Sequence, residues 1–142
     1  MSGNWAKPSH DRDQLVLFSP TLDEMVAADH PVRQLDSILS ELDWTEWEGR
    51  YHGRVGRPAI HPRMMAGAIL YGLMSRARSS RDLELATSTR LDFMWLLHRM
   101  EVDQSTCAAF RKRFDVELKG ITRQINRKAL DRSLSNLIDL AI

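Results

Sequence analysis

The sequence has a single cysteine, Cys107, so no disulfide can form within the chain. None of its five histidines pairs with another histidine or with Cys107 at a spacing typical of zinc sites. No apolar run approaches the roughly 18 residues that span a membrane, and the N-terminal stretch is too polar for a signal peptide. These absences argue against a secreted, membrane or zinc-dependent protein, so we expect a cytoplasmic protein with no cofactor in this chain.

Strand signals are also missing. No segment alternates strictly between apolar and polar residues, and no Asn-Gly or Asp-Gly turn occurs. Apolar residues instead recur at helical spacing, and Pro31 and Pro62 each follow a histidine in a position that suits the first turn of a helix. We therefore predict an all-α fold of six or seven helices, including a helix-turn-helix-like pair and a long C-terminal helix.

The same pattern divides the chain into three parts. Residues 1–29 form a polar N-terminal segment, residues 30–115 a helical domain, and residues 116–142 a C-terminal helix in which Gly120 is expected to mark a bend. Ser79, Thr89 and Asp103 are expected to cap helices that follow them.

Acidic residues are absent from residues 49–81, which contain seven arginines. Residues 1–48 carry ten acids and three bases, a net charge of −7, and residues 82–142 carry ten bases and nine acids, a net charge of +1. A basic segment of this kind is typical of a protein that binds an anionic partner. The alternative is that the acidic first third packs against the basic segment within the fold.

Two features favour double-stranded DNA as that partner. The first is the sequence GRVGRP, in which glycine and proline favour an extended arm and arginine suits a narrow minor groove. We expect Arg57, and secondarily Arg54, to enter that groove. In the competing interpretation Arg57 pairs with Glu46 or Glu48.

The second feature is the helix predicted from Asp103 to Phe114. It begins with polar side chains that can contact base edges and ends with three cations that can contact phosphates. The alternative is an ordinary pair of packed helices with a solvated basic end. No catalytic residue is expected, and Cys107 is expected to be a small buried residue rather than a nucleophile. The complete set of expected DNA-binding residues is Arg54, Arg57, His61, Arg63, Arg76, Arg78, Arg81, Gln104, Ser105, Thr106, Arg111, Lys112 and Arg113.

Three stretches, HPVRQLDSILSELDW, RYHGRVGRPAIHPRMMAGAILYGLMSRARSSRDLELA and LDFMWLLHRMEVDQSTCAAFRKRF, together carry a family resemblance. From about His30 to Phe114 the chain resembles, in order and spacing, the N-terminal domain of InsH-like bacterial insertion-sequence transposases of the DDE class. The resemblance implies an all-helical region that helps to recognise the terminal inverted repeats of the element and to assemble the transposition complex.

In that family a separate ribonuclease-H-like domain holds the Asp-Asp-Glu set and its two divalent metal ions. Asp131 and Asp139 lie in a helical pattern and do not match that set. We therefore expect a DNA-binding domain that is truncated before the catalytic domain and is not active alone. Two alternatives are a dimerisation or regulatory fragment that inhibits full-length transposase, and an enzyme subunit completed by a catalytic partner chain.

Overall fold

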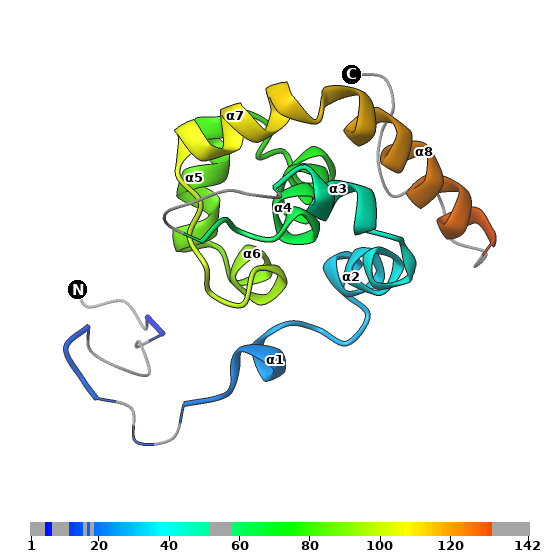
Figure 1. Cartoon of the computed structure of the whole chain (residues 1–142). Coiled ribbons are helices and arrows are strands. Elements are labelled where there is room, and N and C mark those ends of the chain that lie inside the picture. The colour runs from blue at the N-terminus through cyan, green and yellow to red at the C-terminus, as the bar shows by residue number, and fades with distance from the viewer. Residues whose placement is uncertain (1–4, 7–11, 16, 18, 52–57, 132–142) are drawn as a thin grey trace.

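The computed structural model describes residues 5–6, 12–15, 17, 19–51 and 58–131. Within these residues the chain forms eight helices and no strand, which confirms the predicted all-α fold (Figure 1). The helices are α1 (Leu22–Met25), α2 (Pro31–Glu41), α3 (Thr45–Gly49), α4 (Pro62–Ser75), α5 (Ser80–Thr89), α6 (Leu91–Leu96), α7 (Gln104–Arg113) and α8 (Asp115–Asp131).

Helix α4 is the centre of the domain. It packs against α2, α5, α6 and α7, and its residues from Met65 to Gly72 are all buried. Two glycines allow its neighbours to approach closely. A Cβ atom on Gly67 would lie 3.1 Å from Leu39 of α2, and one on Gly72 would lie 2.3 Å from the carbonyl oxygen of Ala77. Helix α4 is thus buried on nearly all sides, as expected of a helix that is apolar around its circumference.

Histidine and aspartate side chains begin three of the helices. The Nδ1 atom of His30 accepts a hydrogen bond from the backbone N–H of Val32, and His61 accepts one from Arg63. Asp103 accepts one from the N–H of Thr106 at 2.7 Å. These side chains satisfy backbone donors that a helix N-terminus leaves unpaired, and they confirm the helix starts expected at Pro31, Pro62 and Gln104.

The structure differs from the sequence-based expectation near α5 and α6. Ser79 caps α5 as predicted, but Thr89 is the last residue of α5 and donates its hydroxyl to the carbonyl of Leu85 instead of capping α6. Helix α6 ends at Leu96, because His98 and Arg99 adopt left-handed conformations with φ of 50° and 65°. The first helix of the predicted helix-turn-helix-like pair is therefore short.

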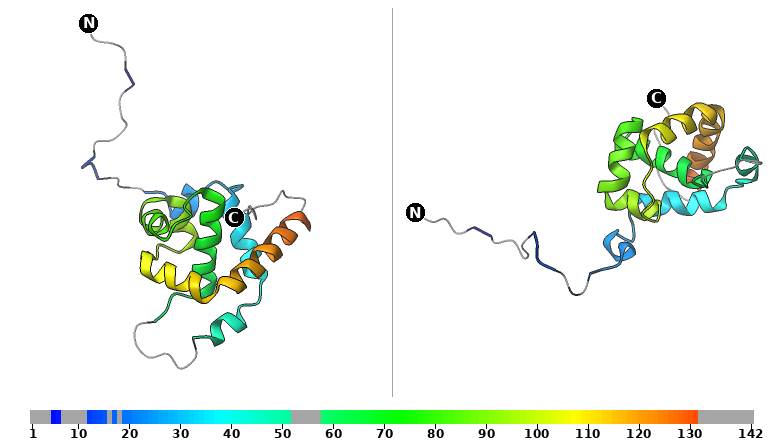
Figure 2. Two further views of the ribbon diagram at one scale, coloured as in Figure 1. Left: turned by 90° about the horizontal axis from the view of Figure 1, so that it is seen from above. Right: turned by 60° about the vertical axis from the view of Figure 1, so that its left-hand side comes forward.

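Both ends of the described chain hold further differences. Helix α1 was not expected, and a reciprocal capping box between Thr21 and Glu24 begins it. Helix α8 runs through Gly120 from Asp115 to Asp131, so the helix does not end at this residue. Figure 2 shows α8 beside α2, against which it packs. Residues 132–142, which belong to the predicted C-terminal helix, lie outside the described residues.

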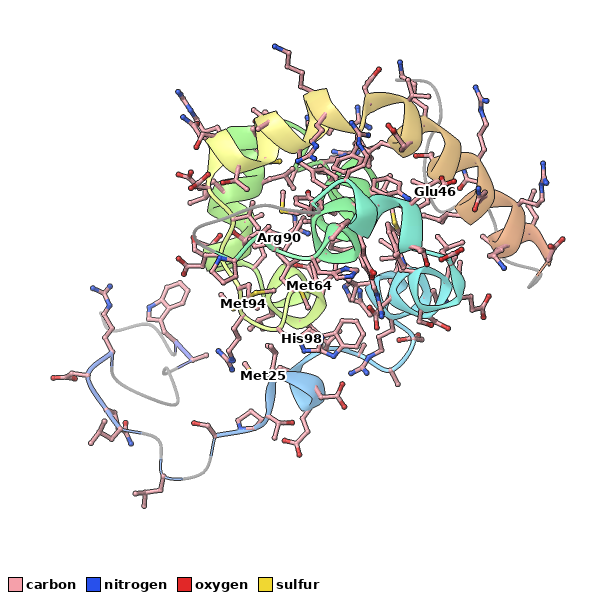
Figure 3. The ribbon with its side chains drawn as sticks, viewed as in Figure 1. Met25, Glu46, Met64, Arg90, Met94 and His98 are labelled. Atoms are coloured by element: carbon pink, nitrogen blue, oxygen red, sulfur yellow. The ribbon has the colours of Figure 1, made fainter. Side chains whose placement is uncertain are left out.

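A polar network joins α4 to the start of α6. The Tyr71 hydroxyl donates to Asp92 Oδ2 at 2.5 Å, and Arg90, labelled in Figure 3, contacts the same carboxylate at 2.7 Å. Burial, together with the hydrogen bond to Asp92, raises the pKa of Tyr71. Burial also acts to raise the pKa of Asp92, but hydrogen bonds from Tyr71 and Arg90 outweigh it, so the pKa of Asp92 is lowered. Arg90 therefore has a structural role, because its guanidinium pairs with Asp92.

Candidate nucleic-acid interface

The chain lies beside α7 just before the GRVGRP arm and again at the last residue of the arm. Arg54 and Arg57 are outside the described residues, but Tyr51, two residues before the arm, and Pro58, the last residue of the arm, are described. Both line an open cleft of about 630 Å³ whose other wall includes Thr106 and Ala109 of α7. The chain therefore leaves and re-enters the described structure next to the helix that was expected to contact bases.

Aromatic side chains fix α3, and with it one end of the arm, against α7. Trp47 of α3 stacks on Phe114 with ring centroids 4.9 Å apart, and Tyr51 stacks on the same ring at 6.0 Å. Trp44 meets Trp47 edge to face at 5.2 Å, and Phe110 lies 4.6 Å from Phe114. Aromatic pairs of this kind add stabilisation beyond the area that they bury.

Two arginines complete this contact. The Arg50 guanidinium lies 4.3 Å from the centre of the Phe114 ring, pairs with Glu117 at 2.6 Å and donates to the backbone carbonyl of Arg113 at 2.9 Å. Arg113 in turn lies over Tyr51 at 4.7 Å and donates to the carbonyl of Arg50. Arg113 was expected to contact phosphate, but one of its guanidinium N–H groups donates to the backbone of Arg50, just before the arm.

Arg111 plays the same part on the other side of α7. Its guanidinium donates to the backbone carbonyl of Arg78, in the turn between α4 and α5. Cys107, one turn earlier on α7, is 1% exposed, and burial raises the pKa of its thiol, as expected for a structural cysteine rather than a nucleophile. The last turn of α7 thus joins both ends of the basic segment, although Arg50 and Arg78 are far apart in sequence.

Four cations of the predicted set are exposed and have no side-chain hydrogen bond within the described part of the chain. Arg76 ends α4 in a left-handed conformation with φ of 66°, Arg78 and Arg81 flank the start of α5, and Lys112 lies on α7. Within the described part of the chain, none of these four side chains forms an ion pair. Their charges are available to an external anion.

His61 and Arg63, by contrast, contact acids from the first third of the chain. Because the Nδ1 atom of His61 accepts the helix-capping hydrogen bond, its Nε2 carries the proton and donates to Glu48 at 2.7 Å. Arg63 pairs with Asp36 at 2.9 Å. The alternative in which the acidic third packs on the basic segment therefore holds at these two positions. Glu46, labelled in Figure 3, lies on the same short helix as Glu48.

The beginning of α7 is polar and has carboxylates around its backbone. Asp103 accepts hydrogen bonds from the N–H of Thr106 and, at 3.0 Å, from the hydroxyl of Ser105. Glu84 of α5 accepts one from the N–H of Gln104 at 2.6 Å. The side chains of Gln104, Ser105 and Thr106 are all exposed. This end of the helix therefore presents neutral hydrogen-bonding groups, whereas its other end is basic.

The two helices that the sequence predicts as a pair correspond to α6 and α7, and both pack against α5. Helix α7 packs most extensively against α5, and α6 packs against α1, α4 and α5. The expected turn between α6 and α7 is irregular from Leu97 to Asp103. Helix α5 is thus the main packing partner of α7, and the sequence pattern did not predict this contact.

The sequence also did not predict the contact of Arg50 with Phe114 or the aromatic cluster around that ring. Trp44, Trp47 and Tyr51 recur at spacings of three and four residues, and Phe110 and Phe114 lie four apart. This periodicity could have indicated two aromatic faces, but only the folded chain shows that they meet.

No group of three or more potential ligand side chains that could hold a metal ion occurs among the described residues. Asp131 ends α8, and Asp139 is outside the described residues. None of the described helices is both long and apolar enough to cross a membrane.

The fold and surface define the described part of the chain as a small all-α domain that carries exposed, unpaired cations at the end of α4, around the start of α5 and on α7. Residues 20–113 match the family described as "Transposase domain (DUF772)", and the chain belongs to this family. This match confirms the relationship to transposases that the sequence motifs indicated. No curated protein and no solved structure matches the chain.

Proposed function

We propose that the chain is a double-stranded DNA-binding domain of an insertion-sequence transposase and that it recognises the terminal inverted repeats of the element. The observation that carries this proposal is the group of four exposed cations, Arg76, Arg78, Arg81 and Lys112, which have no carboxylate partner among the described residues. Exposed cations on a transposase-family domain are suited to the phosphates of DNA, because neutralised phosphates release counterions.

The two ends of α7 favour a particular orientation on DNA. Phosphates are repelled by Asp103 and Glu84 at the start of the helix and attracted by Lys112 at its end. Gln104, Ser105 and Thr106 would then contact base edges in the major groove, where glutamine pairs well with adenine. Arg57 and Arg54 would enter the adjacent minor groove from the arm.

His61, Arg63, Arg111 and Arg113 take a supporting part in this proposal. Each of these side chains has a contact within the protein, so their main contribution is to position the arm and the turn before α5. Arginine has five donors, and apart from the buried Nε of Arg111, those of Arg111 and Arg113 that are not used internally can still approach phosphate.

Cutting and joining of DNA strands would belong to a catalytic domain or partner chain that supplies the acidic residues and divalent metal ions, as the family resemblance implies. Incubation of this chain with DNA and magnesium or manganese is expected to leave the strands intact. Metal-dependent nicking that disappears in Asp131→Asn or Asp139→Asn would contradict this part of the proposal.

Selection from a pool of random duplexes tests the proposal without assuming any target sequence. The expected result is a recurrent sequence motif. Gln104→Ala or Thr106→Ala should change the preference at a few adjacent base pairs, whereas Arg78→Gln should weaken binding to all sequences alike. Absence of enrichment, together with binding of the chain to full-length transposase, would favour the regulatory alternative instead.

A further inference from the structure

Helix α8 has two faces of different character. Its inner face buries Ile121, Ile125 and Ala129 against the rest of the domain. Arg123 and Arg127 are exposed and lie four residues apart, so they project from the same side of the helix one turn from each other. Neither was among the residues that the sequence indicated as DNA-binding.

The other charged side chains near this helix already have partners. Lys119 pairs with Asp115 at 3.2 Å, Lys128 with Glu41 at 3.5 Å, and Glu117 with Arg50 at 2.6 Å. Arg123 and Arg127 form neither an ion pair nor a hydrogen bond within the described part of the chain, although Asp131 follows one turn after Arg127. The unpaired cations of α8 are thus its two arginines, while both of its lysines are paired.

The position of α8 connects these arginines with the candidate interface. Helices α7 and α8 follow each other directly and lie along one outer edge of the domain (Figure 1). Figure 3 shows nitrogen-tipped side chains projecting outward from both helices along this edge. A duplex that lies on α7 therefore has a second basic surface beside it.

We propose that Arg123 and Arg127 form a second contact surface for the phosphate backbone of duplex DNA, on the outer face of α8. This inference rests on the proposed DNA-binding function and extends it to the C-terminal helix, for which no DNA contact was expected. The spacing supports it, because side chains one helical turn apart lie about 5–6 Å from each other, close to the separation of successive phosphates. Arginine also binds phosphate through two parallel hydrogen bonds, which lysine cannot do.

The double variant Arg123→Gln/Arg127→Gln tests this surface by the salt dependence of duplex binding. Each lost phosphate contact should reduce the slope of log K against log salt by about 0.9. When the salt concentration rises from about 50 to about 200 mM, the affinity of both proteins should fall, and the factor by which it falls should be about ten times smaller for the variant than for the unmodified chain. The sequence preference should be unchanged, because phosphate contacts carry no base information.

A matched control removes the same charge from the same helix. Lys119→Gln/Lys128→Gln also eliminates two cations, but both pair with carboxylates, so its slope should stay near that of the unmodified chain. Arg123→Lys/Arg127→Lys keeps the charge and should restore most of the slope. Thermal melting of each variant checks that the domain is folded.

The outcomes separate the two proposals. If the unmodified chain binds no duplex, the proposed function fails. If it binds duplex DNA but the arginine variant keeps the full slope, or the lysine control loses as much, the contact surface on α8 is wrong and the proposed function stands.

Discussion

Arg50 and Arg113 exchange hydrogen bonds, each donating from its guanidinium to the backbone carbonyl of the other. The two residues are 63 positions apart in the sequence, and their guanidinium groups cover the aromatic rings of Phe114 and Tyr51. This relationship fixes the start of the arm relative to α7. At the basic end of α7, Arg113 therefore has a structural role, whereas the neighbouring Lys112 is exposed to solvent.

Removal of Arg50 should therefore destabilise the domain. Arg50→Ala loses the ion pair with Glu117, a hydrogen bond and the contact with Phe114, and should destabilise the domain by about 1–2 kcal/mol. Glu117→Gln loses only the ion pair and should cost less than about 1 kcal/mol. Equal losses in a denaturant titration would show that the aromatic and backbone contacts of Arg50 contribute little.

Two helical glycines should respond in opposite directions to alanine. Gly72→Ala places a Cβ atom 2.3 Å from the carbonyl oxygen of Ala77 and should destabilise the domain by about 2–3 kcal/mol. Gly120→Ala meets nothing within 4 Å and should stabilise α8 by up to about 1 kcal/mol. Denaturant unfolding of both variants measures the two effects, and a stable Gly72→Ala protein would mean that the turn after α4 can move away.

Much of this fold follows from local sequence signals, and the exceptions have physical reasons. His30, His61 and Asp103 mark helix starts because a cap acts on backbone atoms two or three residues away. The left-handed conformations of His98 and Arg99 have no glycine to announce them, so the early end of α6 was missed. Arg111 and Arg113 looked like phosphate ligands because their backbone acceptors, at Arg78 and Arg50, are brought to them only by the folded chain.

The stability contributed by Asp23 should depend on pH. Trp95 Nε1 donates to its carboxylate at 2.8 Å, as does Arg33, and these contacts hold the pKa of Asp23 below its usual value of 3.8. A lowered pKa in the folded state stabilises the protein above the usual value, and this contribution is lost as the pH falls through the lower folded value. Asp23→Asn should thus lower the melting temperature at neutral pH, with a difference that shrinks below about pH 3.8. A constant difference across this range would contradict the assignment.

The arm prediction from the sequence can be decided on one variant by measuring two quantities. If Arg57 enters the minor groove, Arg57→Ala should weaken binding to an A/T-rich target by about 1–3 kcal/mol and affect G/C-rich DNA less, because the guanine amino group obstructs that groove. The melting temperature should stay unchanged. If Arg57 instead pairs with Glu46 or Glu48, the melting temperature should fall while the folded protein keeps its affinity.

The central claim is that exposed, unpaired cations beside α7 bind the phosphates of duplex DNA, and Arg76 offers the most direct test of it. Arg76→Gly removes one of these cations and also relieves a left-handed backbone conformation, so the domain should melt at the same temperature or higher. The decisive measurement is the slope of log K against log salt for the unmodified chain and this variant. We predict a steep, linear fall for the unmodified chain and a slope that is flatter by about 0.9 for Arg76→Gly. Salt-independent binding, or an unchanged slope in a variant that is fully folded, would contradict the claim.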